Sequence, residues 1–263
     1  MFFITFAPLY SNHHKMKKTA LLVLPLFLLF ACQSRQEPAK TETNANEGTK
    51  PETMVVEGEE PLPGSGLRDA KPPSQETKNT STLARRGMEL IQAQNYAEGI
   101  EYLNRALENE PQNTRILFSR GFAYLNMKDY DKALADFNSS LVINPADTAV
   151  LYHSGLARYH KGDYNGAFRD YSNAISKSKR FPKAYLNRGL VRGQLKDYKG
   201  AVEDFTQAIS FDPNYSQAYY NRGLANFYKK DTMNACSDWI QANRLGSTEA
   251  QKAIDIYCNK QAQ

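Results

Sequence analysis

Few side chains in this sequence have the type and spacing that catalysis or metal binding requires. His153 and His160 lie seven residues apart, on one side of a helix, but no carboxylate or thiol cluster stands near them at ligand spacing. Nucleophile elbows, phosphate-binding glycine loops and HExxH sequences are absent from the chain. We therefore expect no enzymatic activity, no cofactor and no metal, with both histidines exposed or lining a groove.

The composition also limits the classes of function that are open to the chain. With 33 Lys and Arg against 28 Asp and Glu, the 263 residues carry a formal net charge of +5. This excess is too small to indicate a dedicated nucleic-acid-binding protein. Hydrophobic residues make up 41% of the chain, which excludes a protein with many membrane-spanning helices but allows a sizeable core.

Of the three cysteines, Cys32 stands at the end of an uncharged apolar run over residues 20–32. Three lysines precede the run, which is shorter than the roughly 20 residues of a transmembrane helix, as in a secretory signal. Its last four residues, Leu-Phe-Ala-Cys, resemble the lipobox of bacterial lipoproteins. The resemblance implies that a signal peptide of residues 1–31 is removed and that Cys32 carries the lipid anchor, diacylglycerol with acyl chains such as palmitate. The alternative is an ordinary signal peptide that holds a cysteine by chance.

The same segment indicates where translation starts and where the protein goes. Met16 opens a compact Met-Lys-Lys signal, so we expect translation to begin there rather than at Met1. Gln33, and not an aspartate, follows the cysteine, which resembles outer-membrane sorting in enteric bacteria. We therefore expect a lipoprotein of the bacterial outer membrane that faces the periplasm, with the cell surface as the alternative.

Residues 32–79 have a composition that is unsuited to a folded core. From residue 33 to residue 80 there is no Phe, Tyr or Trp, there are six of the chain's twelve prolines, and nine acidic residues outnumber six basic ones. Such a segment buries too little apolar surface to offset its conformational entropy. We expect a disordered tether that links the lipid to a folded module.

A strict spacing of 34 residues begins at residue 80. Five glycines form one arithmetic series: Gly87, Gly121, Gly155, Gly189 and Gly223. Small residues recur twelve and nineteen places after each glycine, and a large apolar residue (Leu, Phe, Tyr, Phe, Trp) recurs sixteen places after it. A period of 34 is typical of stacked pairs of antiparallel helices. Small side chains let the two helices approach, and the large ones fill the gap between pairs.

Two further patterns accompany these columns. A turn of Asn or Asp before Tyr recurs at Tyr96, Tyr130, Tyr164 and Tyr198, and prolines follow three second helices at Pro111, Pro145 and Pro213. Together the residues resemble the tetratricopeptide repeat (TPR) family. The resemblance implies an all-α solenoid with repeats at 80–113, 114–147, 148–181, 182–215 and 216–249. We expect repeats over residues 80–247, then a capping helix and tail over 248–263, with the helix at Thr248–Lys260 covering the core of the last repeat.

Cys236 and Cys258 remain as a pair once Cys32 is assigned to the lipid. They lie ten residues before and twelve residues after Gly246, the expected turn between the last repeat and the cap, so antiparallel helices would bring them level. A disulfide would then join the cap to repeat five in an oxidising compartment. The alternative is two buried free thiols that pack as small hydrophobic side chains.

The family resemblance also implies where a partner binds, because the first helix of each TPR repeat lines a groove. The groove residues transferred to this sequence are Phe118, Phe122, Asn126, Tyr152, Tyr159, His160, Lys183, Asn187, Gln194, Tyr220, Asn221, Phe227 and Tyr228. This aromatic and nearly neutral face suits an extended peptide or a partner helix. The alternative for any one of these residues is simple packing between adjacent first helices.

We therefore expect an envelope scaffold that binds a protein or peptide partner and no nucleic acid. Family analogy suggests the assembly of secretion, pilus or cell-wall machinery. The alternative from another class of protein is a non-catalytic receptor that takes a glycan or a small ligand in the groove.

Two patterns of charge lie beside the groove. An arginine directly precedes three glycines of the series, at Arg120, Arg188 and Arg222. Aspartates also recur every 34 residues, at Asp136, Asp170, Asp204 and Asp238. We expect them to form surface ion pairs along or between repeats, which stabilise a fold only slightly. A basic turn comprises Lys177, Lys179, Arg180 and Lys183. We expect it to be solvated, with an acidic partner or a phosphate as the alternative.

Overall fold

The computed structural model describes residues 79–258, and this part contains eleven α-helices and no strand. The prediction of an all-α fold is confirmed. The predicted signal peptide, Cys32 and the linker up to residue 78 lie outside the described residues, as does the tail from residue 259. None of the described helices has the length and apolar character needed to cross a membrane.

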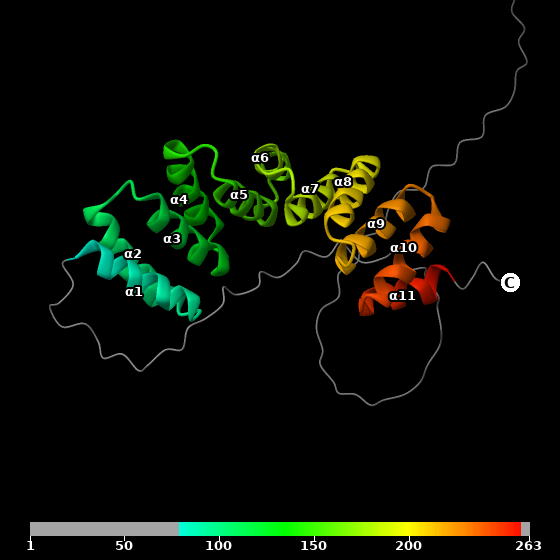
Figure 1. Cartoon of the computed structure of the whole chain (residues 1–263), viewed down its shortest axis with the longest axis horizontal. Coiled ribbons are helices and arrows are strands. Elements are labelled where there is room, and N and C mark those ends of the chain that lie inside the picture. Colours follow the sequence, from blue (N-terminus) through cyan, green and yellow to red (C-terminus); the bar gives the residue numbers. More distant parts are fainter. Residues whose placement is uncertain (1–78, 259–263) are drawn as a thin grey trace, which may run out of the picture. The chain divides into compact units, whose positions relative to one another are not determined.

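Ten of these helices form five pairs that repeat every 34 residues (Figure 1). The first helices of the pairs are α1 (Thr80–Gln92), α3 (Thr114–Asn126), α5 (Thr148–Lys161), α7 (Pro182–Gln194) and α9 (Ser216–Tyr228). The second helices are α2 (Tyr96–Asn109), α4 (Tyr130–Ile143), α6 (Tyr164–Lys177), α8 (Tyr198–Phe211) and α10 (Thr232–Arg244). One more helix, α11 (Thr248–Tyr257), follows the last pair. The five helix–turn–helix repeats expected from the glycine series are therefore present.

The second helices α2, α4, α6 and α8 each pack between the first helix of their own repeat and that of the next. For example, α4 contacts α3 and α5, and α8 contacts α7 and α9. The first helices also contact one another in succession, from α1 and α3 to α7 and α9. Side chains from neighbouring first helices therefore lie together on one surface, which we call the first-helix face.

The glycine column marks the points where the paired helices approach most closely. A Cβ atom on Gly121 would lie 2.7 Å from Cε1 of Phe137, and one on Gly189 would lie 2.6 Å from Cε1 of Phe205. Both phenylalanines are fully buried, as is Trp239 in the same column. The large side chains thus occupy the space that any residue bigger than glycine would need.

Aspartate side chains cap four of the five second helices, α4, α6, α8 and α10. At α6, Asp163 accepts a hydrogen bond from the backbone N–H of Gly166, and this bond lowers the pKa of the carboxyl group. Corresponding aspartates begin α4, α8 and α10. Two first helices, α7 and α9, have no side-chain cap. Their cap positions hold Phe181 and Tyr215, whose side chains make no capping bond.

In repeats two, four and five the Arg and Asp columns form pairs with buried carboxylates, so the prediction of weak surface ion pairs is wrong for these repeats. Nε and Nη2 of Arg188 donate to the two carboxylate oxygens of Asp204, at 3.0 and 2.6 Å, and Asp204 is only 2% exposed. Nη1 of the same arginine reaches Ser172 in the preceding repeat at 3.2 Å. Arg120 and Arg222 form the same arrangement. The carboxylates are buried because they lie between the two helices of a repeat, where the bidentate bonds offset their desolvation.

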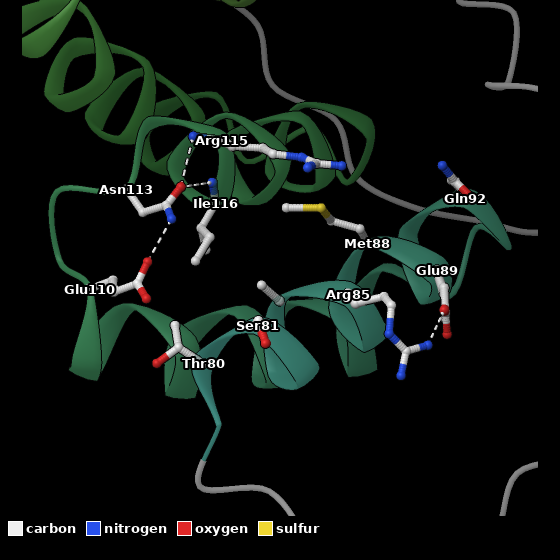
Figure 2. A pocket seen from close by; sticks show the side chains of 11 residues that line it. Thr80, Ser81, Arg85, Met88, Glu89, Gln92, Glu110, Asn113, Arg115 and Ile116 are labelled. Atoms are coloured by element: carbon white, nitrogen blue, oxygen red, sulfur yellow. Dashed lines mark hydrogen bonds and ion pairs between the residues drawn. The ribbon is translucent and has the colours of Figure 1, made fainter.

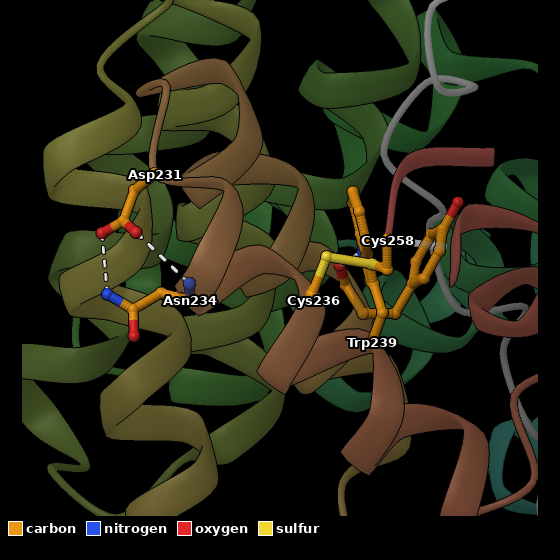
Figure 3. Close-up of a disulfide and its surroundings, with 6 residues drawn as sticks. Asp231, Asn234, Cys236, Trp239 and Cys258 are labelled. Atoms are coloured by element: carbon orange, nitrogen blue, oxygen red, sulfur yellow. Dashed lines mark hydrogen bonds between the residues drawn. A yellow bond between two sulfur atoms is a disulfide. The ribbon is translucent and has the colours of Figure 1, made fainter. Parts of the chain in front are cut away.

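Helix α11 packs against repeat five. Its buried residues are Ala250 and Ala253, while Ile254 and Tyr257 are half-buried against the same apolar cluster. It begins two residues before the next 34-residue repeat would start, and it ends at Tyr257, earlier than the predicted Lys260. The next residue, Cys258, is held against α10 by a disulfide to Cys236, with the two Cα atoms 5.8 Å apart (Figure 3).

Candidate partner-binding face

The middle of the first-helix face is filled by aromatic contacts between α3 and α5. The His153 ring lies 5.3 Å from the Phe118 ring, 5.4 Å from the Phe122 ring and 5.2 Å from the Tyr152 ring. All of these side chains are half-buried. Two of the predicted groove residues from α3 and one from α5 therefore also serve as packing between adjacent repeats.

Hydrogen bonds close the face between α5 and α7. Nδ2 of Asn187 donates to the Tyr152 hydroxyl at 3.0 Å, and Nε2 of Gln194 donates to the Tyr159 hydroxyl at 3.5 Å. In both pairs the partners are 35 residues apart, that is, in adjacent repeats. Burial raises the pKa of Tyr159, so its phenol stays protonated at neutral pH.

Three of the predicted partner-binding residues are buried in the structure. Asn187 is 4% exposed, Tyr220 is 5% exposed, and Asn221 is fully buried with its Nδ2 donating to the backbone oxygen of Gln217. Asn187 points toward the neighbouring first helix, because its side chain donates to Tyr152 of α5. A partner would have to displace side chains to reach the two asparagines.

The remaining predicted residues lie toward the turns and the two ends of the face. His160 stacks on Tyr130 with ring centroids 5.6 Å apart, and Tyr228 stacks on Tyr198 at 5.1 Å. The Phe227 ring packs on Tyr257 of α11 at 4.6 Å. Asn126 donates to the backbone of its own helix, and Lys183 is exposed at the start of α7. The thirteen predicted residues are thus divided between packing and accessible surface, and a role for them in binding stays a prediction.

The first-helix face is hollowed between α1 and α3. This N-terminal hollow has a volume of about 420 Å³ and is lined by Thr80, Ser81, Ala84, Arg85, Met88, Glu89, Gln92, Glu110, Asn113, Arg115 and Ile116. Met88 and Ile116 extend into it, and Arg115 lies along its upper edge in Figure 2. The predicted groove residues include none from repeat one. The signal was present, because the fifth position of this repeat is Ala84, where the later repeats have Phe, Tyr or Leu.

A second hollow lies where α7, α9 and α11 begin. This C-terminal hollow has a volume of about 790 Å³ and is lined by Phe181, Pro182, Lys183, Asp212, Asn214, Tyr215, Ser216, Gln217, Tyr220, Ser247 and Glu249. Three aromatic rings line it, and Lys183, Asp212 and Glu249 are exposed at its rim. Lys183 and Tyr220 belong to the predicted set; the contribution from the loop before α9 and from α11 was not predicted.

The side chains of this face are aromatic, amide and hydroxyl groups with a few charges. Within residues 79–258 no group of three or more His, Cys, Asp or Glu side chains is arranged to hold a metal ion. Burial raises the pKa of Tyr228 as it does that of Tyr159, so the tyrosine hydroxyls act as neutral donors and acceptors. Aromatic rings, amides and a few charges at the rims of the hollows supply apolar contact and directional hydrogen bonds.

Sequence models of known families match the repeats. Models described as tetratricopeptide repeat match residues 85–148 and 182–215, and one described as TPR repeat matches residues 155–196. The chain belongs to the tetratricopeptide repeat family. Among curated proteins, none matches this TPR chain.

Solved structures share the fold of this TPR protein at low sequence identity. A crystal structure of MamA is 21% identical with a TM-score of 0.60, over 65% of this chain and 94% of MamA. MamA from Desulfovibrio magneticus RS-1 is 19% identical with a TM-score of 0.61, over 63% of this chain and 94% of that one. YrrB, described as a TPR protein with an unusual peptide-binding site, is 16% identical with a TM-score of 0.61, over 69% and 94% of the two chains. At such identities the likeness shows the fold alone.

Proposed function

We propose that this TPR protein is a non-catalytic adaptor that binds a protein or peptide partner on the first-helix face. The observation that carries the proposal is the pair of hollows at the two ends of that face. Each combines an apolar floor with polar and charged rims, as sites for peptide side chains do. YrrB, a protein of the same fold, has a peptide-binding site, which agrees with this choice.

The lining of the hollows favours a peptide over a glycan or a small ligand. Arg85, Gln92 and Arg115 are exposed around the N-terminal hollow, so that hollow opens to solvent along the helices. An extended chain can run along such an open surface and place separate side chains in separate hollows. A receptor for a small molecule would instead be expected to enclose most of its ligand.

We further propose that the adaptor works at the bacterial cell envelope. Its support is the sequence of residues 1–79: a signal peptide ending at residue 31, a lipid on Cys32 and a linker that would hold the repeats away from the membrane. In this proposal the lipid places the protein on the outer membrane, facing the periplasm, and the first-helix face recruits a component of secretion, pilus or cell-wall machinery.

The test of partner binding compares charge reversals at the hollows with one elsewhere. Arg115→Glu changes the N-terminal hollow and Lys183→Glu the C-terminal hollow, and both residues are exposed, so the fold should be retained. Lys199→Glu, exposed on α8, is the matched control. We expect proteins crosslinked to the wild type in intact envelopes to be recovered roughly tenfold less with at least one hollow variant and equally with the control. Equal recovery with all three variants would refute binding at the hollows.

A separate variant tests the anchor. Cys32→Ser removes the lipid acceptor, and the expected result is that the protein moves from the membrane fraction to the soluble fraction. Unchanged membrane attachment of this variant would contradict the lipoprotein proposal without bearing on the first-helix face.

A further inference from the structure

Helix α11 is held to repeat five by few apolar contacts. Only Ala250 and Ala253 are buried, and each contributes a single methyl group, while Ile254 and Tyr257 are half-buried. The helix has ten residues, fewer than the 12–15 or so that an isolated helix needs to be even marginally stable in water. Side-chain packing alone is therefore a weak hold on this helix.

A covalent bond supplements this packing. Cys236 of α10 and Cys258, the residue after α11, form a disulfide at the end of α11 that lies farthest from its turn to α10 (Figure 3). Both cysteines are half-buried, so the disulfide lies near the surface of the fold and not in its core. The bond closes the segment from α10 to α11 and limits how far α11 can move away.

The position of α11 affects two other parts of the molecule. Tyr257 packs on Phe227 and on Trp239, with ring centroids 4.6 and 5.8 Å apart, and so covers the last apolar cluster. At its other end, Ser247 and Glu249 form one side of the C-terminal hollow. Release of α11 would uncover aromatic surface and remove that side of the hollow.

We propose that α11 is a thiol-controlled wall of the C-terminal hollow, closed while the Cys236–Cys258 disulfide is intact and open when it is reduced. The reductant is a dithiol, such as that of a thiol–disulfide oxidoreductase. One of its thiolates attacks a sulfur of the disulfide and forms a mixed disulfide, and its second thiol then displaces the protein sulfur. The products are two cysteine thiols and an oxidised dithiol, so two electrons and two protons pass to the protein. The hollow's use as a peptide site rests on the proposed function, but the opening of α11 does not.

The opening can be followed in the full chain through its single tryptophan. Trp239 is fully buried, and its indole N–H donates to the backbone oxygen of Tyr220. Dithiothreitol is added until titration counts two more thiols per chain. We expect a red shift of the tryptophan emission and roughly 100-fold faster amide exchange in residues 248–258, with unchanged exchange in α3 to α6. Unchanged emission and exchange after reduction would overturn the proposal, as would a disulfide that resists reduction in the folded protein.

A variant without the disulfide serves as the control. Cys236→Ser/Cys258→Ser should show the red-shifted emission and fast exchange before any dithiothreitol is added, and dithiothreitol should change neither. A variant that keeps the emission and exchange of the oxidised wild type would show that packing alone holds α11, and would overturn the proposal. None of these measurements uses a partner, so failure of partner binding and failure of the wall are distinguishable.

Discussion

Single residues set the distance between the helices of each repeat. The glycine column permits contacts shorter than any Cβ atom would allow, and the buried Phe, Tyr or Trp sixteen places later fills the space that remains. The sequence predicted that the large residues fill the gap between helix pairs, whereas in the structure each one packs on the glycine of its own repeat. A change in the size of either the glycine or the large residue should therefore lower the stability of the fold.

Gly121→Ala is expected to destabilise the protein in spite of alanine's higher helix propensity. The new Cβ would overlap the Phe137 ring, an overpacking cost of about 1–3 kcal/mol, against a gain in propensity of about 1 kcal/mol. Urea unfolding should show a net loss of up to about 2 kcal/mol. In the double variant Gly121→Ala/Phe137→Leu the two losses should be less than additive, because the smaller side chain relieves the overlap. Full additivity would contradict this explanation.

The arginine network also belongs to the scale of single residues. Repeat three has Ser154 where the other interior repeats have arginine, and there Asp170 accepts hydrogen bonds from Ser154 at 2.7 Å and from Arg158 at 2.9 Å. Burial raises the pKa of Asp170 and of Asp204, and the neighbouring arginines oppose that rise. The sequence predicted that these residues pair. How deeply the carboxylates are buried depends on the neighbouring helices, and the spacing of residues along the chain does not describe that packing.

At the scale of elements, helix starts are defined by local sequence. Asn113 accepts hydrogen bonds from the backbone N–H groups of Arg115 and Ile116 at the start of α3, whereas Asn95 before α2 makes no such bond. A capping bond forms between a side chain and the backbone two or three residues later. The local sequence is therefore sufficient to indicate where most of the described helices begin. The starts of α7 and α9 lack a side-chain cap, and both line the C-terminal hollow together with the capped start of α11.

Asn113→Ala should cost about 1 kcal/mol of stability, because two backbone N–H groups at the start of α3 lose their acceptor. Asn95→Ala is the matched control, and its cost should stay below about 0.5 kcal/mol, as for an exposed side chain without a capping bond. The measurement is the midpoint of urea unfolding for each variant. Similar losses in the two would show that the capping bond is not the cause.

At the scale of the whole molecule, each repeat contacts only its neighbours, and the ends differ from the interior. Two apolar residues of α3 have polar counterparts in α1: Thr82 stands in the place of Ile116, and Glu89 in the place of Ala123. The first repeat therefore has a more polar outer edge. At the other end α11 covers the last repeat. A stack of this kind should tolerate the loss of a whole interior unit.

Removal of residues 148–181, one full repeat, should leave a folded protein. The junction would place Asp147 directly before Pro182, a suitable cap and first residue for α7, and Arg188 would meet Asn138 in place of Ser172. Circular dichroism should show the same helicity per repeat and a cooperative melt at a lower temperature, since one interface is lost.

The control for this experiment is removal of half a period, residues 148–164, which joins two second helices without a first helix between them. That variant should lose cooperative melting. A broad melt for the full-period deletion as well would contradict the view that the repeats are equivalent.

The sequence by itself determined the period of 34, the helix pairs, the Arg and Asp columns and the pair of cysteines that the structure joins. These features depend on residues at fixed separations, so a repeat in sequence implies a repeat in contacts. Only the tertiary structure decided that the carboxylates are buried, that Asn187 and Asn221 are buried in packing between repeats, and that the hollows lie at the two ends of the first-helix face. Burial and cavities depend on the summed volumes of side chains from several helices, and the spacing of residues along the chain does not specify that sum.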